Sequence, residues 1–223
     1  MSTTARLYED IRLFTNRDDL DSNTIMPRFV RLAEAQLNRD IRHWRMENRA
    51  YYPTSDRYVA RPEDWLETIR LTIEGEWHEL EPISTSDMAR RRGIADDAVG
   101  TPRYFRHSEN AIELFPTPAE EVQLNLEYYQ KIPALTLTDA VLPGDTIIET
   151  NWLLQEHYDL VLYCCLMHAA QYLMDQDMLG QYTPMYAAIA QQVNGESRKS
   201  MTAAAGRRLR PRGLAGHRSN VRR

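Results

Sequence analysis

Three side chains in the C-terminal half of the chain have the types and spacing of metal ligands. His157, Cys164 and His168 are separated by seven and four residues, which places all three on one face of a helix. Imidazole and thiolate groups are ligands that Zn²⁺ takes in proteins. A single straight helix, however, cannot surround a tetrahedral ion, and a cysteine in an apolar helix behaves as a small hydrophobic residue. The sequence therefore predicts that these residues pack against their neighbours and hold no metal.

The same segment could supply a nucleophile and its base, because Cys164 and His168 lie one helical turn apart. Covalent catalysis needs a reactive side chain with a base within hydrogen-bond reach. The sequence has no strand–turn–helix pattern that would expose the thiol of Cys164 or of its neighbour Cys165. Adjacent cysteines rarely pair with each other, so a disulfide framework is also excluded. We expect two buried thiols in a reducing compartment.

Acidic side chains gather in the middle of the chain, and paired carboxylates can act as general acid and base. They are Glu63, Asp64, Glu67, Glu113, Glu120 and Glu121. Acids in turns are usually solvated, and the chain has no Walker loop, no G-x-G-x-x-G and no H-E-x-x-H. The sequence therefore predicts a protein that is not an enzyme and that has no catalytic residues and no cofactor.

The net charge of −5 conceals two parts of opposite charge. Nine of the 27 basic residues and none of the 32 acidic residues lie at positions 198–223. Residues 1–197 therefore carry a formal charge of −14, and residues 198–223 carry +9. Only two of the basic residues are lysines, and arginine makes planar, bidentate contacts with carboxylates and phosphates. The pattern predicts an acidic body with a basic arm.

The basic arm is rich in glycine, proline and arginine, so we expect residues 206–223 to be extended. Its arginines are Arg207, Arg208, Arg210, Arg212, Arg218, Arg222 and Arg223. Such a segment could bind the phosphates of a nucleic acid, or it could become ordered on an acidic protein surface. It could also be a free solubilising tail. The scarcity of lysine favours a fixed protein contact over diffuse attraction to DNA.

Apolar side chains recur at helical spacing near both ends of the chain. We expect helices over residues 7–14, 25–44 and 152–174, and a last helix that begins at Thr183 and Pro184 after Gly180. Asn194 and Gly195 are expected to kink or end this last helix. The longest apolar run, residues 160–167, is too short to span a bilayer, and no signal peptide opens the chain. We therefore expect a soluble protein that is not secreted.

The predicted helix over residues 152–174 is apolar nearly all round its C-terminal half. A helix of this kind has to be covered on every side, either by its own fold or by neighbouring subunits. The residues that we expect to be buried or to lie between subunits are Trp152, Leu160, Tyr163, Leu166 and Tyr172.

Between residues 49 and 134 the apolar period changes to two, as in strands. Residues 69–73 predict a strand, Glu74 and Gly75 a turn, and residues 77–80 the returning strand. A second hairpin is expected over residues 104–107 and 111–115, and a further strand over 122–128. Between them, Thr85 or Ser86 is expected to cap a short helix that contains residues 88–92.

The order of these elements predicts an α+β fold, in which N- and C-terminal helices form one bundle with an inserted antiparallel β module and an extended basic tail. The expected divisions are residues 1–48 for the N-terminal helices, 49–150 for the β-rich insertion, 151–205 for the C-terminal helices and 206–223 for the tail.

Several motifs carry a resemblance to a known family, and the match extends over residues 25–195. The first are Leu32-Ala33-Glu34, Leu37-Asn38-Arg39, Ile41-Arg42 and Met46-Glu47, and then Pro62-Glu63-Asp64-Trp65-Leu66-Glu67. The next are Gly100-Thr101-Pro102-Arg103-Tyr104 and Ile112-Glu113-Leu114-Phe115-Pro116-Thr117-Pro118. The most specific is Leu126-Glu127-Tyr128-Tyr129-Gln130-Lys131-Ile132-Pro133-Ala134-Leu135, followed by Asn151-Trp152-Leu153-Leu154 and Ala169-Ala170-Gln171-Tyr172-Leu173. In order and spacing they resemble bacteriophage head-to-tail adaptor proteins, also called head-completion or connector proteins.

This resemblance implies a structural viral protein at the head–tail interface of a virion, assembled in the host cytoplasm. It implies a ring, typically of twelve copies, that binds the portal protein on one side and the tail nozzle or the next connector on the other. The basic tail would reach the portal, and genomic DNA would pass through the channel without specific binding. The alternative is a nucleic-acid-binding protein that uses the arginine-rich tail.

Overall fold

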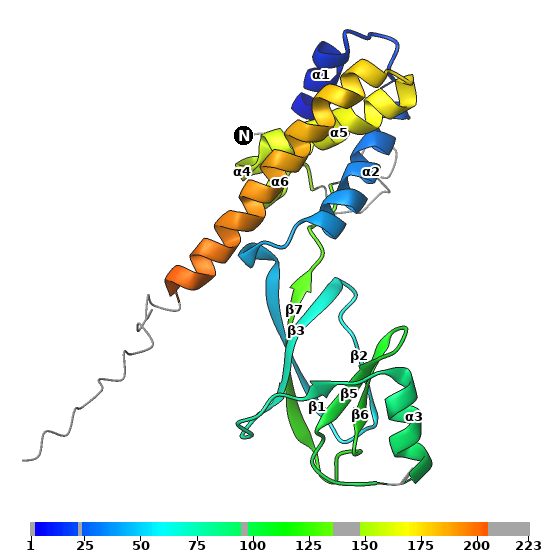
Figure 1. The fold of residues 1–223 in the computed structure, drawn as a ribbon, viewed down its shortest axis with the longest axis vertical. Helices are drawn as coiled ribbons and strands as arrows, with labels where there is room; N and C mark the ends of the chain where they lie inside the picture. The colour runs from blue at the N-terminus through cyan, green and yellow to red at the C-terminus, as the bar shows by residue number, and fades with distance from the viewer. Residues whose placement is uncertain (1–2, 22–23, 95–97, 136–147, 205–223) are drawn as a thin grey trace, which may run out of the picture.

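A computed structural model describes residues 3–21, 24–94, 98–135 and 148–204 of the chain, with side chains as far as Ser197. Helices α1, α2, α4, α5 and α6 gather at one end of an elongated molecule, and the strands lie at the other end together with α3 (Figure 1), which confirms the predicted α+β class. The helices are α1 (Thr4–Thr15), α2 (Ile25–Asp40), α3 (Thr85–Ile94), α4 (Trp152–Glu156), α5 (Tyr158–Leu173) and α6 (Gln176–Ala204), with a short 3₁₀ helix η1 (Trp44–Met46). The strands are β1 (Glu47–Thr54), β2 (Tyr58–Ala60), β3 (Trp65–Ile73), β4 (Glu81–Pro82), β5 (Tyr104–His107), β6 (Ala111–Phe115) and β7 (Val122–Gln130).

Helix α5 lies at the centre of the helical end because it is apolar on nearly all sides. It contacts α1, α2, α4 and α6, and its buried side chains join theirs in one hydrophobic core. The neighbouring α1 is closed at both ends by local signals. The Thr3 hydroxyl accepts a hydrogen bond from the Arg6 N–H, and Asn16 ends the helix in the left-handed conformation.

Two of the predicted helix boundaries in the C-terminal half are wrong. The single helix expected over residues 152–174 is broken at His157 into α4 and α5. The last helix begins at Gln176 rather than at Thr183, because the Asp175 carboxylate accepts a hydrogen bond from the Met178 N–H at 3.0 Å in its first turn.

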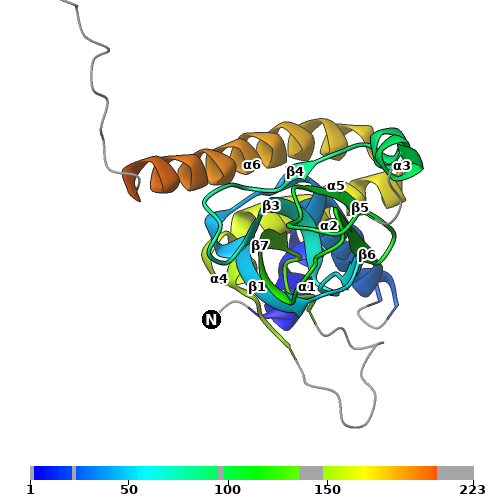
Figure 2. The ribbon, with the colours of Figure 1, turned by 90° about the horizontal axis from the view of Figure 1, so that it is seen from below.

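Helix α6 runs without an end through Gly180 and Pro184, and Asn194 does not end it either. The reason is packing: its side chains Tyr182, Tyr186 and Val193 are buried in the core against α5, and this outweighs the local preference of single residues. Figure 2 shows α6 lying along one side of the molecule.

The β module consists of two sheets. One is antiparallel with the order β1-β7-β3, and the other has the order β2-β6-β5-β4, in which β4 runs parallel to β5. The predicted hairpin of residues 104–107 and 111–115 is confirmed as β5 and β6, and the strand predicted over 122–128 is confirmed as β7. A second hydrophobic cluster, with Leu71, Ile112 and Leu126 among its most buried members, joins the two sheets.

The strand predicted over residues 77–80 is wrong. After the turn at Gly75, whose φ of +86° suits glycine, the chain pairs with β3 at an isolated bridge from Glu79 to Thr72 and forms no continuous strand there. It then crosses to the other sheet as β4, because Glu81 and Ile83 donate their N–H groups to Arg103 and Phe105 of the second sheet. The loop is therefore free of strand pairing at its tip.

The predicted short helix is observed as α3, but its cap is Ser84 rather than Thr85 or Ser86. The Ser84 hydroxyl accepts a hydrogen bond from the Asp87 N–H at 3.1 Å, and its carbonyl accepts one from Met88. The β module also contains β1 and β2, which alternation in the sequence indicated only as part of a broad β-rich region.

Candidate interaction surfaces

The junction between the helical end and the β module is held by side chains of α6. The Asn194 side chain accepts the Arg42 N–H at 2.8 Å and donates to the Asp40 carbonyl at 2.9 Å. The Ser197 hydroxyl accepts the Trp44 N–H at 2.9 Å. These bonds satisfy backbone groups where α2 ends and η1 begins, so the segment that leads into β1 is fixed against α6.

His43 lies at the centre of this junction and is buried. Its ring stacks on Trp152 with 5.1 Å between ring centroids and faces His157 edge-on at 5.8 Å. Its Nδ1 atom accepts the Arg45 N–H at 3.3 Å. Burial lowers the pKa of His43, and electrostatic interactions with His157 and Arg45 lower it further, although Glu156 and Glu196 act in the opposite direction. The ring is therefore held in its neutral form, and one face of it is covered by the indole.

The junction is expected to weaken in acid because of His43. The pKa of His43 is lower in the folded protein than the ordinary value of 6.5 that it has in the unfolded chain. Above pH 6.5 the histidine is neutral in both states and does not change the free energy of unfolding. As the pH falls below 6.5 toward the lowered pKa, the unfolded chain binds the proton first, and the folded protein loses stability. Denaturant unfolding at pH 7.5 and 5.5 measures the change in the free energy of unfolding between the two pH values. We expect this change to be smaller in the variant His43→Phe than in wild type. The matched variant His78→Phe, on the loop between β3 and β4, should keep it. Equal pH dependence in wild type and His43→Phe would contradict the assignment.

One face of the β1-β7-β3 sheet carries an ion-pair row that crosses all three strands. Arg49 and Arg70 are both paired in register with Glu127 on the central strand, and each donates to its carboxylate, Arg70 at 2.7 Å. Hydrogen bonds from Arg70 lower the pKa of Glu127. Burial acts in the opposite direction, but the charges of both arginines lower the pKa further. The carboxylate is therefore held ionised between two guanidinium groups.

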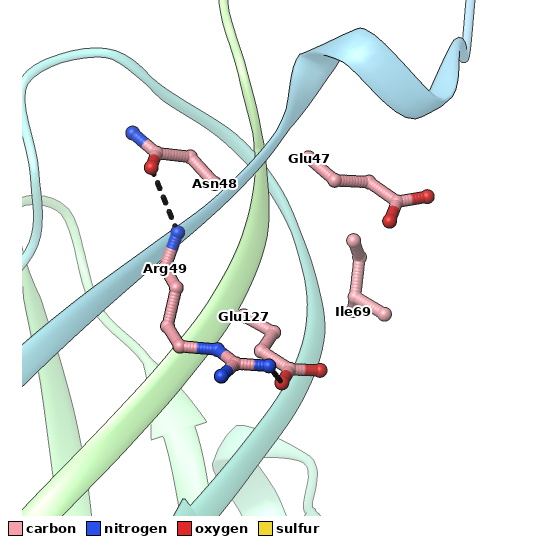
Figure 3. Close-up of a pocket in the computed structure, with 5 residues that line it drawn as sticks. All are labelled: Glu47, Asn48, Arg49, Ile69 and Glu127. Atoms are coloured by element: carbon pink, nitrogen blue, oxygen red, sulfur yellow. Dashed lines mark hydrogen bonds and ion pairs between the residues drawn. The ribbon is translucent and has the colours of Figure 1, made fainter.

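A shallow pocket opens beside this row, and Figure 3 shows its lining from β1, β3 and β7. Glu47 and Ile69 lie on one side, while Arg49 reaches across to Glu127 and its backbone N–H donates to Asn48. Burial and the charge of Glu127 raise the pKa of Glu47. The lining therefore combines two carboxylates, a guanidinium group and an amide with one apolar side chain, Ile69.

A second ion cluster surrounds Glu113 on β6, of which only 1% is exposed. Arg57 and Arg106 each donate two hydrogen bonds to its carboxylate, at distances between 2.5 and 3.0 Å. Arg92 of α3 approaches to 3.6 Å and donates to the Leu114 carbonyl at 2.6 Å. Burial alone would raise the pKa of Glu113, but the hydrogen bonds from the two arginines outweigh it and lower the pKa. The cluster ties β2, β5, β6 and α3 together.

The predicted buried or inter-subunit residues occupy different depths. Leu160 and Leu166 are fully buried in α5, whereas Trp152 and Tyr163 are half-buried. Tyr172 is 57% exposed and contacts Phe29 of α2 edge-on. The arginines of the predicted portal-binding tail, at positions 207–223, lie outside the described residues.

The predicted burial of both thiols is confirmed. The thiol of Cys164 points to the Ala33 carbonyl at 3.9 Å, and burial raises its pKa to about 12. The pKa of Cys165 is also raised by burial. His157 lies at the junction with His43, and His168 is half-buried in α5. Among the described residues no group of three His, Cys, Asp or Glu side chains is placed to hold a metal ion.

Three of the six acidic residues of the middle segment, Asp64, Glu67 and Glu113, are bound to neighbouring groups, whereas Glu120 and Glu121 are exposed. The Asp64 carboxylate accepts a hydrogen bond from the Tyr128 hydroxyl at 3.0 Å, and Glu67 pairs with Arg42 at 2.7 Å. Together with Glu113 in its arginine cluster, they act as fixed acceptors that hold strands and helices in place.

Sequence reasoning missed the most exposed aromatic residue, Trp77, because it was placed in a strand. The structure puts it at the tip of the loop between β3 and β4, with 94% of its surface exposed. The available signal was the composition of the loop, in which glutamates surround a tryptophan directly after the turn at Gly75. Such a pattern is typical of a solvent-facing loop and not of a strand with one buried face.

Comparison with known proteins places these surfaces in a family context. None of the helices in the described ranges has the length and apolar character needed to cross a membrane. No curated protein matches the chain. The family described as SU10 adaptor protein matches residues 2–212, which is nearly the whole chain. The chain therefore belongs to the SU10 adaptor protein family, a family of phage head–tail adaptors, as the resemblance of its motifs had implied.

Proposed function

We propose that the protein forms a ring, of about twelve copies in keeping with the family resemblance, between the portal of the capsid and the tail. In this position one side of the ring binds the portal protein, and the other binds the tail nozzle or the next connector. Packaged DNA leaves through the central channel. The observation that carries this proposal is the family match over residues 2–212.

The charge distribution supports the same proposal. Residues 1–197 carry a formal charge of −14, and a channel wall of this sign repels phosphates and lets DNA slide past. Residues 198–223 carry +9, almost all of it on arginine. Arginine makes short, charge-assisted bonds to carboxylates, so the tail suits an acidic groove on the portal.

The state of the reactive side chains favours a structural role. Both thiols are buried, and the pKa of each is raised, so neither is a thiolate near neutral pH. The carboxylates of Glu113 and Glu127 are held between arginines. The two carboxylates stabilise the fold through these ion pairs.

Images of the purified protein with and without its portal protein test the ring directly. We expect end-on views that show a closed ring with a central channel, on the portal or free in solution. A protein that stays monomeric in both conditions would contradict the proposed function.

Deletion of residues 206–223 is expected to weaken portal binding at least about tenfold, because it removes seven arginines that can each make charge-assisted hydrogen bonds. Binding is measured by surface plasmon resonance or by co-sedimentation with portal particles. A matched variant changes Arg207, Arg208, Arg210 and Arg212 to lysine, which keeps the charge but loses the bidentate geometry. Unchanged affinity of the deletion variant would exclude the tail as the portal contact.

The same tail makes DNA binding the alternative function, since residues 206–223 contain seven arginines and no acid. In that case the full-length protein would bind duplex DNA tightly, with an affinity that falls steeply as salt increases, and the deletion variant would not. The adaptor function predicts weak DNA binding by both proteins. The two functions are therefore separated by one salt titration.

A further inference from the structure

The loop between β3 and β4, residues 74–80, together with Glu81 at the start of β4, forms an exposed acidic loop with an aromatic tip. Trp77 is 94% exposed, and the four glutamates around it, Glu74, Glu76, Glu79 and Glu81, are exposed as well. A tryptophan in water forgoes the burial of a large apolar surface. Tryptophan is also among the residues that contribute most to binding when a partner covers them. The acidic loop thus has both the anchor and the charge of a docking element.

The base of the acidic loop is fixed, so its tip is presented in a defined position. Gly75 adopts its positive φ, and the Glu76 N–H donates to the Ile73 carbonyl at 3.1 Å. On the returning side Leu80 is buried, and its N–H donates to the Leu71 carbonyl at 2.9 Å. A tip that is already fixed in position loses less conformational entropy on binding than a flexible loop does.

A surface of opposite charge lies on the exposed face of α2. Five exposed residues lie there at helical spacing, and three of them are arginines. We call this surface the basic stripe: Arg28, Arg31, Leu32, Ala35 and Arg39. Leu32, at the centre, is 52% exposed. The two acids of the helix are engaged within the chain, because Glu34 accepts the Leu135 N–H at 2.8 Å and Asp40 accepts the Tyr186 hydroxyl at 2.7 Å. Three guanidinium groups thus lie around an exposed apolar centre, and Arg31 also interacts electrostatically with Glu34 of the same helix.

We propose that the acidic loop of one copy of this chain docks on the basic stripe of the next copy. The inference deepens the proposed function, on which it rests, by naming the surfaces that join neighbouring subunits. Complementary charge and shape identify the next copy as the occupant: the glutamates of the loop would face the guanidinium groups of the stripe, and the Trp77 ring would meet Leu32 and Ala35. Within its own copy, Glu79 lies 3.7 Å from Arg70 and Glu76 lies 3.7 Å from His78, and both glutamates are exposed enough to reach a second partner. An indole beside arginine also gains from the cation–π attraction.

The two surfaces lie where such a contact requires them. In Figure 1 the loop between β3 and β4 projects on the left of the molecule, whereas α2 lies on the right, so one copy cannot bring its own two surfaces together. A contact between two different surfaces of identical copies is head-to-tail, and repeating it produces a ring when the rotation closes. Because the loop belongs to the β end and α2 to the helical end, neighbouring copies would be inclined to each other.

Two variants test the contact by complementation. The loop variant carries Trp77→Ala and Glu76→Lys, and the stripe variant carries Arg28→Glu and Arg31→Glu. Each alone is expected to assemble at least about tenfold less well than wild type, measured by analytical ultracentrifugation alone and with the portal protein. Mixed in equal amounts, they are expected to form dimers and nothing larger, because the intact loop of one variant meets the intact stripe of the other and no second contact is available.

A control variant combines Met174→Ala with Glu120→Lys, which removes an exposed apolar side chain and reverses one charge elsewhere. It should assemble like wild type, and circular dichroism melting checks that all variants fold. If wild type forms rings and the loop and stripe variants do as well, the inference is wrong while the proposed function stands. If the loop variant and the variant lacking residues 206–223 both fail to assemble while the stripe variant assembles normally, the loop binds the basic tail instead, which also overturns the inference. If wild type never forms a ring, the proposed function itself fails.

Discussion

Replacing Glu113 by alanine is expected to lower the free energy of unfolding by about 3–5 kcal/mol, the range observed when one partner of a buried ion pair is removed. The reason is that the buried Arg92 and the partly exposed Arg57 and Arg106 would then face one another without the carboxylate, while four hydrogen bonds to it are lost. Denaturant unfolding followed by tryptophan fluorescence gives the free energy. A loss below about 1 kcal/mol would show that the cluster does not hold the β module together.

The variant Glu113→Gln separates charge from shape, because it keeps the size and one acceptor oxygen. The pKa of Glu113 is lowered in the folded protein, so its contribution is complete above the ordinary value of 4.5 and is lost as the pH falls toward the lowered pKa. Wild type should therefore lose stability in this acid range more steeply than Glu113→Gln. The exposed Glu120→Gln is the matched control and should follow wild type.

Replacing Leu166 by alanine is expected to cost about 2–5 kcal/mol of unfolding free energy, since truncating a fully buried leucine leaves a cavity that the surroundings fill only in part. Leu166 lies in α5, which is in contact with α1, α2, α4 and α6, so no single helix can move in to close the gap. Thermal and urea unfolding both measure the effect.

The control on the same helix is Tyr172→Ala. This residue is 57% exposed and makes one edge-on contact with Phe29, which suggests a cost of about 1 kcal/mol in the monomer. If both variants were destabilised equally, α5 would not be the centre of the core. If Tyr172→Ala impaired assembly without lowering stability, Tyr172 would lie at a subunit interface.

Periodicity in the sequence predicted the elements whose packing is regular. The alternation of residues 122–128 identified β7, because this central strand has one face on the core at every second position. The mostly apolar segment of residues 160–173 indicated that α5 is covered on nearly all sides. In both cases the burial of a residue depends on its neighbours along the chain, which is the information that a periodic pattern contains.

The errors occur where a distant contact decides the local conformation. Gly180 and Pro184 favour a helix end, but burial of Tyr182 and Tyr186 against α5 extends α6 through them. Glu113 looks like a solvated turn acid in the sequence, and its arginines come from β5, α3 and the segment before β2. No spacing along the chain reveals such a cluster, since its members meet only after the sheets have formed.

Helix α6 gives the molecule a mechanical connection. It extends from the core, where Tyr186 is buried, to Asn194 and Ser197, which bind the backbone at Arg42 and Trp44. The chain beyond Ala204 continues from this helix. A helix resists stretching because its backbone bonds run along its axis. A pulling force applied beyond residue 204 would therefore be transmitted along α6. The hydrogen bonds of Asn194 and Ser197 would be the first to resist separation of the helical end from the β module.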